Sequence, residues 1–223
     1  EEATLQPNEF LRVHRNQWVS STAEAIPLEW WAACFDPHPL RVDANGRGEL
    51  TPLVVAADAS VSDDSTSLVV VSRHPEQSDH VCERHCKIWI PPKGGKMDYE
   101  TTLTAELKRM VDAGFNIVEV AYDPYQLHQW AINIRRDLGL WCREFPQGQD
   151  RLKADKTLVD LVRDRRLHHR GDEALTQHIK NCNAKTEADQ DSKLRLIKKA
   201  ADRKIDGAVA LSMATAECLR LNL

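Results

Sequence analysis

Three acidic residues stand where apolar stretches of the sequence begin or end. Asp58 ends the run 53–58, Asp123 ends the run 116–123, and Asp206 heads an apolar helical segment. Short runs rich in valine and alanine are typical of buried central strands. An acid at the end of such a strand costs free energy unless a positive group faces it. The three acids together predict a single site.

The chemistry of three clustered carboxylates points to metal ions. Such groups repel one another, and hard cations relieve the repulsion by neutralising them. Ligands that offer only oxygen favour Mg²⁺ or Mn²⁺ over Zn²⁺. Two such ions, roughly 4 Å apart, activate a water on one side of a phosphodiester and stabilise the leaving oxygen on the other. In this interpretation Asp58 bridges both ions, while Asp123 and Asp206 each hold one.

Each acid also has a simpler interpretation as a helix cap. Asp123 precedes Pro124 and Asp206 precedes Gly207, and both positions suit an N-cap whose carboxylate accepts backbone N–H groups. Asp58 fits this explanation less well because it follows a strand. The occurrence of all three acids in one chain favours the metal site over separate caps.

A dense group of basic residues lies immediately before Asp206. It offers phosphate contacts for a nucleic acid, and a solvated charged surface is an equally good explanation. The six candidate DNA-binding residues are Lys193, Arg195, Lys198, Lys199, Arg203 and Lys204.

Four residues between positions 80 and 86 have zinc-binding side chains. A structural zinc site normally has better spaced ligand pairs. On a regular strand Cys82 and Cys86 would share a face with His80, whereas His85 would point away. We therefore do not expect zinc to bind to this set.

The elements that must position these residues follow from hydrophobic periodicity and from turn residues. Strands are expected at about 53–58, 67–73 and 80–90, a helix at 98–113, a strand at 117–122, a helix at 124–138 and a short strand at 140–145. Helices at about 152–166 and 172–181, a possible hairpin within 182–204 and a last helix at 206–221 follow. The order β-β-β-α-β-α-β-α predicts an α/β fold with a mixed central sheet flanked by helices.

The first 48 residues differ in pattern from the rest. Short amphipathic patches around Trp18, Trp30 and Trp31 precede a stretch rich in proline, glycine and aspartate. We interpret residues 1–48 as an arm with one or two short helices and a linker, and residues 49–223 as the main domain. The tryptophans either pack on that domain or mark a surface for a partner.

Composition sets broad limits on the protein. The chain has 223 residues, 42% hydrophobic content and a net charge of −4, so it can bury a substantial core. No apolar stretch approaches the roughly 18 residues of a membrane span, so we expect no membrane partner and a cytoplasmic location. The six scattered cysteines suggest buried free thiols rather than a disulfide framework.

The chain resembles the nuclease domain of the large terminase subunit of tailed bacteriophages, which has an RNase H-like fold. The residues that carry the resemblance are 54–58, 120–123 and, most specifically, 204–214. Weaker similarities are the segments 145–148 and 167–169 and the tryptophan patches, including residues 16–18. By motif match, the metal-binding acids of that family fall on Asp58, Asp123 and Asp206.

The resemblance implies a two-metal, Mg²⁺- or Mn²⁺-dependent endonuclease that cuts concatemeric double-stranded viral DNA during genome packaging in the host cytoplasm. It also implies two protein partners, the small terminase subunit and the portal protein. The family's large subunit has an N-terminal ATPase, yet no Gly-x-x-x-x-Gly-Lys-Ser/Thr phosphate loop occurs here. We therefore expect this chain to be a C-terminal fragment of a longer protein.

Two other functions are compatible with the same sequence. One is a resolvase-like or transposase-like nuclease of the same fold, which would act on branched DNA or on specific DNA ends. The other is a non-catalytic module that docks on DNA or on the portal, with the tryptophans as its contact surface. Preference for four-way junctions would indicate the first, and metal-independent binding without cleavage the second.

Overall fold

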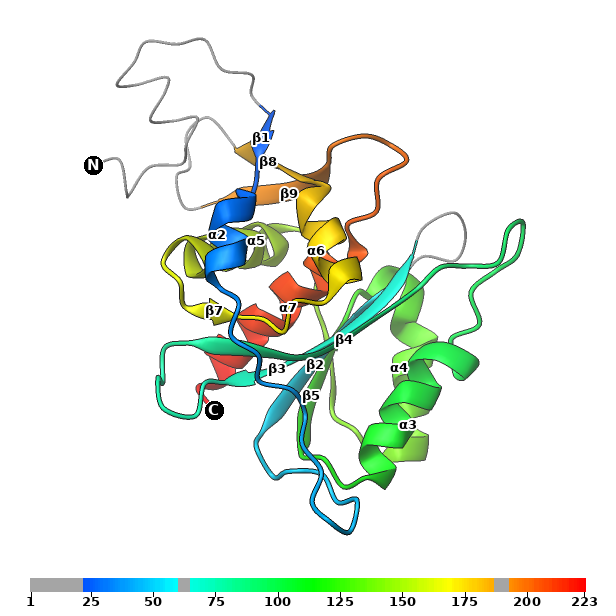
Figure 1. Ribbon diagram of the computed structural model, residues 1–223. Coiled ribbons are helices and arrows are strands. Elements are labelled where there is room, and N and C mark those ends of the chain that lie inside the picture. The colour runs from blue at the N-terminus through cyan, green and yellow to red at the C-terminus, as the bar shows by residue number, and fades with distance from the viewer. Residues whose placement is uncertain (1–21, 60–64, 187–192) are drawn as a thin grey trace, which may run out of the picture.

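Six strands form the central sheet of the computed structural model, which describes residues 22–59, 65–186 and 193–223. They are Leu53–Asp58 (β2), Thr66–Arg73 (β3), Val81–Trp89 (β4), Ile117–Tyr122 (β5), Cys142–Glu144 (β6) and Leu167–His168 (β7). Their order across the sheet is β6-β5-β2-β3-β4-β7. The pairs β2–β3 and β3–β4 are antiparallel, whereas β2–β5, β5–β6 and β4–β7 are parallel. The expected mixed sheet is confirmed (Figure 1).

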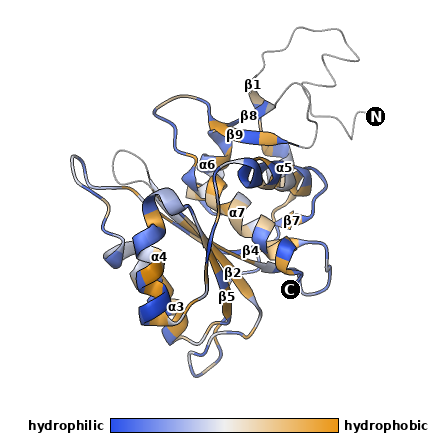
Figure 2. Cartoon of the chain, turned by 180° about the vertical axis from the view of Figure 1, so that it is seen from behind, coloured by the Kyte–Doolittle hydropathy of each residue, from blue (hydrophilic) through white to orange (hydrophobic). Residues whose placement is uncertain are grey.

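Both faces of this sheet are covered. Successive residues of β2 point to opposite faces, as strand geometry requires. Val55 and Ala57 belong to one hydrophobic core, and Val54 and Ala56 belong to the other; all four are fully buried. The sheet is therefore the middle layer of three, and Figure 2 shows hydrophobic residues concentrated along β2 and β5.

One face packs against α3 (Ala105–Asp112) and α4 (Pro124–Leu138). A π-helical turn, Glu100–Thr104, precedes α3 within the segment where we expected ordinary helix. Helix α4 starts with its proline in the first turn, where a missing N–H costs nothing. It ends at Gly139, whose φ of 68° is left-handed and therefore unstrained for glycine.

The other face packs against α5 (Gln149–Arg163), α6 (Glu173–Lys180) and α7 (Asp206–Leu221). Helix α7 is apolar on nearly all sides because it lies between the sheet and the outer helices, and most of its residues are buried. A helix that is hydrophobic all round belongs inside a protein. Its first residue, the predicted ligand Asp206, is therefore held by the core.

A second, three-stranded sheet lies beyond these helices. Its strands are Thr22–Glu24 (β1), Cys182–Thr186 (β8) and Leu194–Lys198 (β9), in the antiparallel order β1-β8-β9. The expected hairpin is the pair β8–β9. Helix α2 (Leu28–Ala33) follows β1, and its Trp31 packs by stacking on a histidine ring at 4.0 Å.

Most other expected elements are found within one or two residues. Helix α5 begins at Gln149, three residues earlier than expected, and the two-residue strand β7 was not expected at all. The patch at residues 16–18 lies outside the described residues. The domain boundary at residue 48 stays a prediction.

Strand β4 contains a bulge that changes the direction of its side chains. Val70 pairs with His85 and Val71 pairs with Glu83, so that Arg84 is an extra residue. A bulge of this kind shifts the alternation of side chains by one position. Cys82 and Cys86 therefore lie on opposite faces, and the expectation that they share one is wrong.

All six cysteines are free and buried, as the sequence suggested. Burial raises the pKa of every one of these thiols, to about 11 for Cys34, Cys142 and Cys218. They are consequently protonated and unreactive at neutral pH. No helix within the described residues is long and apolar enough to span a membrane.

Candidate active site

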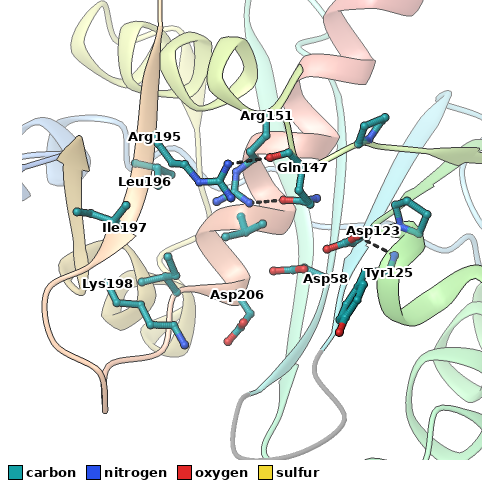
Figure 3. Close-up of a pocket in the computed structure, with 14 residues that line it drawn as sticks. Asp58, Asp123, Tyr125, Gln147, Arg151, Arg195, Leu196, Ile197, Lys198 and Asp206 are labelled. Carbon is teal, nitrogen blue, oxygen red and sulfur yellow. Dashed lines mark hydrogen bonds between the residues drawn. The ribbon is translucent and has the colours of Figure 1, made fainter. Parts of the chain in front are cut away.

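The three predicted acids line one open cavity of about 930 Å³. Figure 3 shows Asp58, Asp123 and Asp206 around this space, together with side chains from the opposite wall. The cavity lies between the sheet, the start of α4, the start of α7 and strand β9. Its other lining residues are Pro124, Tyr125, Pro146, Gln147, Arg151, Arg195, Leu196, Ile197, Lys198, Ile205 and Val209.

Asp58 and Asp123 come together because their strands are parallel neighbours. Ala57 of β2 pairs with Tyr122 of β5, and each acid is the next residue along its chain. The ends of parallel strands with the same direction lie at the same edge of a sheet. The convergence was expected if these two strands were adjacent, and the sheet order meets that condition.

Asp123 is also the N-cap of α4. Its Oδ1 accepts the backbone N–H of Tyr125 at 3.0 Å. The cap interpretation is therefore correct for this residue, but it does not exclude a second role. A carboxylate has two oxygens with several acceptor positions, and Asp123 also lines the cavity.

Asp206 occupies the first turn of α7, and the N-cap position belongs to Ile205. The carboxylate is 8% exposed and accepts a short hydrogen bond from the hydroxyl of Ser65, which precedes β3. At the next position the N–H of Gly207 donates to Nδ1 of His178 at 2.9 Å. The free N–H groups of a helix start favour a negative charge, so this position suits an ionised carboxylate.

A buried polar network forms the cavity wall opposite the sheet. The Nε of Arg151 donates to both oxygens of Asp155 at 2.8 Å, and its Nη1 donates to Oε1 of Gln147 at 2.6 Å. Asp155 also accepts the hydroxyl of Ser212 at 2.6 Å and the N–H of Leu196 at 2.9 Å. The network therefore ties α5, α7 and β9 together and fixes the shape of the wall.

The six predicted DNA-binding residues separate into two groups. Arg195 and Lys198 line the cavity, and Nη1 of Arg195 donates to the carbonyl of Gln147 at 2.7 Å. Of the other four, Lys199 is exposed and its Nζ lies 3.0 Å from a carboxylate oxygen of Glu24. The remaining three are Lys193, Arg203 and Lys204, and of these Arg203 and Lys204 follow β9.

Several cavity residues were not predicted from the sequence. Gln147 belongs to the segment 145–148 whose resemblance was noted, but Arg151 and Tyr125 gave no signal because each side chain is common in its helix. Outside the cavity lining, burial, followed by the charge of Asp58, raises the pKa of the Tyr99 hydroxyl. Only the fold brings these residues to the acids.

The residues at positions 80–86 do not gather as a zinc site. Cys82 and Cys86 lie on opposite faces of β4, and Nε2 of His85 lies 3.0 Å from Oε1 of Glu106. His80 instead contacts His168 on strand β7. The sequence-based expectation against zinc at this set agrees with this arrangement.

The chain is similar in sequence and in fold to large terminase subunits of bacteriophages. The large terminase subunit of Enterobacteria phage HK97 is 26% identical over 93% of this chain and 44% of its own length. The crystal structure of the HK97 large terminase superposes with a TM-score of 0.72 at 22% identity, covering 95% of this chain and 47% of that one. The large terminase nuclease of thermophilic phage G20c, solved with bound magnesium, gives a TM-score of 0.60 at 11% identity over 89% and 99%.

These comparisons confirm an RNase H-like fold. The chain spans about half the length of the curated relatives it matches. Residues 92–221, more than half of the chain, match the family model of the terminase large subunit, endonuclease domain. The chain therefore belongs to the family of terminase large subunit endonuclease domains.

Proposed function

We propose that this domain is a metal-dependent endonuclease that hydrolyses phosphodiester bonds of double-stranded viral DNA. The observation that carries the proposal is the convergence of Asp58, Asp123 and Asp206 on one open cavity next to basic side chains. In the longer protein the domain would cut concatemeric DNA during genome packaging in the host cytoplasm. DNA would be its substrate, with the small terminase subunit and the portal protein as partners.

The donor set of the cavity fits two Mg²⁺ or Mn²⁺ ions. Its three acids offer oxygen ligands, and the described residues that line it include no cysteine or histidine. Asp58 would be shared by both ions, while Asp123 and Asp206 would each hold one. When bound, such ions supply an activated water and stabilise the leaving oxygen.

The chain's own residues hold these acids in place. Asp123 is oriented by the N–H of Tyr125, and Asp206 is oriented by Ser65 and by its position in the first turn of α7. A carboxylate held by fixed donors loses little entropy when it takes a ligand. The carboxylates at this end of the sheet would therefore already be oriented to bind cations before DNA binds.

Basic side chains on β9 and after it would hold the DNA backbone. Arg195 and Lys198 face the acids across the cavity (Figure 3), where a phosphate would lie between cationic side chains and the metal ligands. Lys199 and Arg203 are exposed further along the same segment, and Lys193 and Lys204 flank it. These contacts are with phosphate, so we propose cleavage with little sequence preference.

Plasmid cleavage tests the proposal directly. The chain is incubated with supercoiled plasmid in Mg²⁺, Mn²⁺ or EDTA, beside Asp58→Asn. We expect nicking and linearisation that require the metal and fall by a factor on the order of 10³ in the variant, because the shared ligand is lost. Asp112→Asn is the matched control, since Asp112 is exposed on α3 and pairs with Lys108 at 2.7 Å.

Three results would contradict the proposal. Equal cleavage by the wild type and Asp58→Asn would exclude the assigned ligand. Absence of cleavage with either metal, combined with metal-independent DNA binding, would favour the docking module. Strong preference for four-way junctions over linear duplex would favour a resolvase-like enzyme instead.

A further inference from the structure

A group of imidazoles lies at the end of the sheet opposite the acid cavity. Asp58 and Ser67 pair at one end of the β2–β3 ladder, whereas His74 follows β3 at the other end. His168 lies on β7, which pairs with the start of β4 at that same end. Figure 1 shows the chain that leaves α2 passing β7 and the turn between β3 and β4. That passing segment carries Asp36 and His38.

These side chains converge on one point. The ligand atoms of Asp36, His38, His74 and His168 all lie within 4.8 Å of one another. Nε2 of His38 lies 3.1 Å from Oδ2 of Asp36, and Nδ1 of His168 lies 3.0 Å from the same oxygen. Two imidazole nitrogens thus point at one carboxylate oxygen, with a third imidazole beside them.

The spacing of these atoms fits a small tetrahedral ion. Zinc binds nitrogen and oxygen at about 2.0–2.1 Å, so the ligand atoms of a tetrahedral site lie about 3.3 Å apart. The two measured separations from Asp36 are slightly shorter, and small side-chain rotations would open them. Imidazole nitrogen with one carboxylate is a donor set for Zn²⁺ rather than for Mg²⁺.

The contact between Nε2 of His168 and His80 leaves Nδ1 of His168 as the nitrogen that can bind a metal. Its Nε2 lies 2.8 Å from Nδ1 of His80, while its Nδ1 faces Asp36. A metal-binding histidine usually donates its other ring N–H to a neighbour, which fixes the tautomer and the ring orientation. His80 is placed to accept that proton, so Nδ1 of His168 presents a lone pair.

His74 has a different role in the group. Its Nδ1 accepts the N–H groups of Glu76 and Gln77 at 3.2 and 3.1 Å. In a neutral ring the proton must then be on Nε2, so this ring does not present a lone pair to an ion while those bonds persist. His74 packs against His38 and His168, with ring centroids 4.8 Å apart in each case. It therefore contributes packing to the group rather than a ligand atom.

The backbone that carries the ligands is held independently of them. The buried guanidinium of Arg84 donates from Nε to the carbonyl of His38 at 2.6 Å and from Nη2 to that of Pro39 at 3.3 Å. The N–H of Asp36 donates to the carbonyl of His169 at 3.2 Å. The two ligand-bearing segments are therefore already adjacent, which reduces the entropy that metal binding costs.

We propose that Asp36, His38 and His168 form a structural Zn²⁺ site, separate from the nuclease cavity. A bound ion would tie the segment after α2 to β7. The ion would thereby fix the N-terminal part of the described chain to the sheet. The nuclease reaction would not need this ion.

The test uses a chain whose acid cavity has been disabled, so that metal bound there does not interfere. In Asp58→Asn/Asp123→Asn/Asp206→Asn, freed of metal with EDTA, Zn²⁺ is titrated by calorimetry and Co²⁺ by its visible absorption. We expect one Zn²⁺ per chain and a tetrahedral Co²⁺ spectrum. Adding His38→Gln or His168→Gln should weaken binding at least about tenfold, because a first ligand is lost.

The matched control is His128→Gln, since His128 is an exposed histidine on α4 that lies 3.2 Å from Glu144. It should bind Zn²⁺ as the background chain does. Far-UV circular dichroism checks folding, and if His168→Gln is unfolded the exposed Asp36→Asn takes its place. The proposal is overturned if the background chain binds no Zn²⁺, or if Asp36→Asn and His38→Gln bind it unchanged.

Discussion

The two ends of the central sheet carry different sets of side chains that could bind metal ions. At one end Asp58, Asp123 and Asp206 line an open cavity of about 930 Å³. At the other end His38 and His168 crowd one oxygen of Asp36, with atoms 3.0–3.1 Å apart. The first arrangement leaves room for a substrate beside its ligands, whereas the second is filled by its own side chains.

Under the two proposals, one end of the sheet would carry out the reaction and the other would stabilise the fold. Hard oxygen ligands in an open cavity suit ions that keep exchangeable positions for water and phosphate. Two imidazoles and a carboxylate, with a third ring packed against them, suit a bound ion that would contribute to folding. The distance between strand ends keeps the two sites apart, so each can be removed without the other.

The largest expected effect separates the two ends by activity. Asp206→Asn should reduce Mg²⁺-dependent plasmid cleavage by a factor on the order of 10³, because it removes a proposed ligand. When Asp58→Asn and Asp123→Asn are added, so that no metal binds in the cavity, the chain should still bind one Zn²⁺, which calorimetry measures. Loss of zinc binding in this variant would show that the two ends are not independent.

The next effect concerns how much the ion pair in the wall of the acid cavity stabilises the fold. Asp155→Ala should lower the free energy of unfolding by about 3–5 kcal/mol, because Arg151 is left buried without its partner. Urea unfolding measures this change. Asp160→Ala is the control, since its partners Lys156 and Arg163 are partly exposed, and about 0–1 kcal/mol is expected there. Similar losses in both variants would mean that the wall is held by other contacts.

Glu106 is a buried acid that belongs to neither group of possible metal ligands, so it can be compared with both. Glu106 is 4% exposed and accepts from His85 at 3.0 Å, Lys87 at 2.9 Å and Arg109 at 3.1 Å. The hydrogen bond with His85, followed by those with Arg109 and Lys87, holds the pKa of this carboxyl well below its usual range. Its oxygens are satisfied by side chains, so added metal should change nothing here.

Stability should therefore depend on pH through Glu106. Because its pKa is lower in the folded state, its contribution is complete above the unfolded value of about 4.3 and is lost as the pH falls below it. Glu106→Gln should cost about 1.5–3 kcal/mol at pH 7, and the difference from wild type should shrink as the pH falls below about 5. Urea unfolding from pH 7 to pH 3 measures both, and a constant difference would contradict this assignment.

The smallest effect concerns DNA binding at the acid end. Lys198→Met should reduce the magnitude of the slope of log K against log salt by about 1, because one phosphate contact is lost. Fluorescence anisotropy with duplex DNA at several salt concentrations measures the slope. Lys108→Met on α3, far from the cavity, should leave it unchanged, and equal slopes in all three proteins would remove Lys198 from the interface.

The sequence alone determined the element order and the three acids. Alternating apolar residues fix strand faces locally, and the caps at Pro124 and Gly139 fix the ends of a helix, so the strands and helices could be located from short stretches. The acids at the ends of apolar runs could likewise be named from position. The family resemblance rested on these same local motifs.

Tertiary structure decided which distant residues meet. Arg151 lines the cavity of the acids because of how α5 packs on the sheet, and no local pattern records this. The bulge at Arg84 reversed the direction of side chains that a regular strand predicts. Asp36 and His168, 132 positions apart in the sequence, meet because β7 joins the sheet edge beside β4. Pairing between such distant segments depends on the packing of the whole core rather than on either segment.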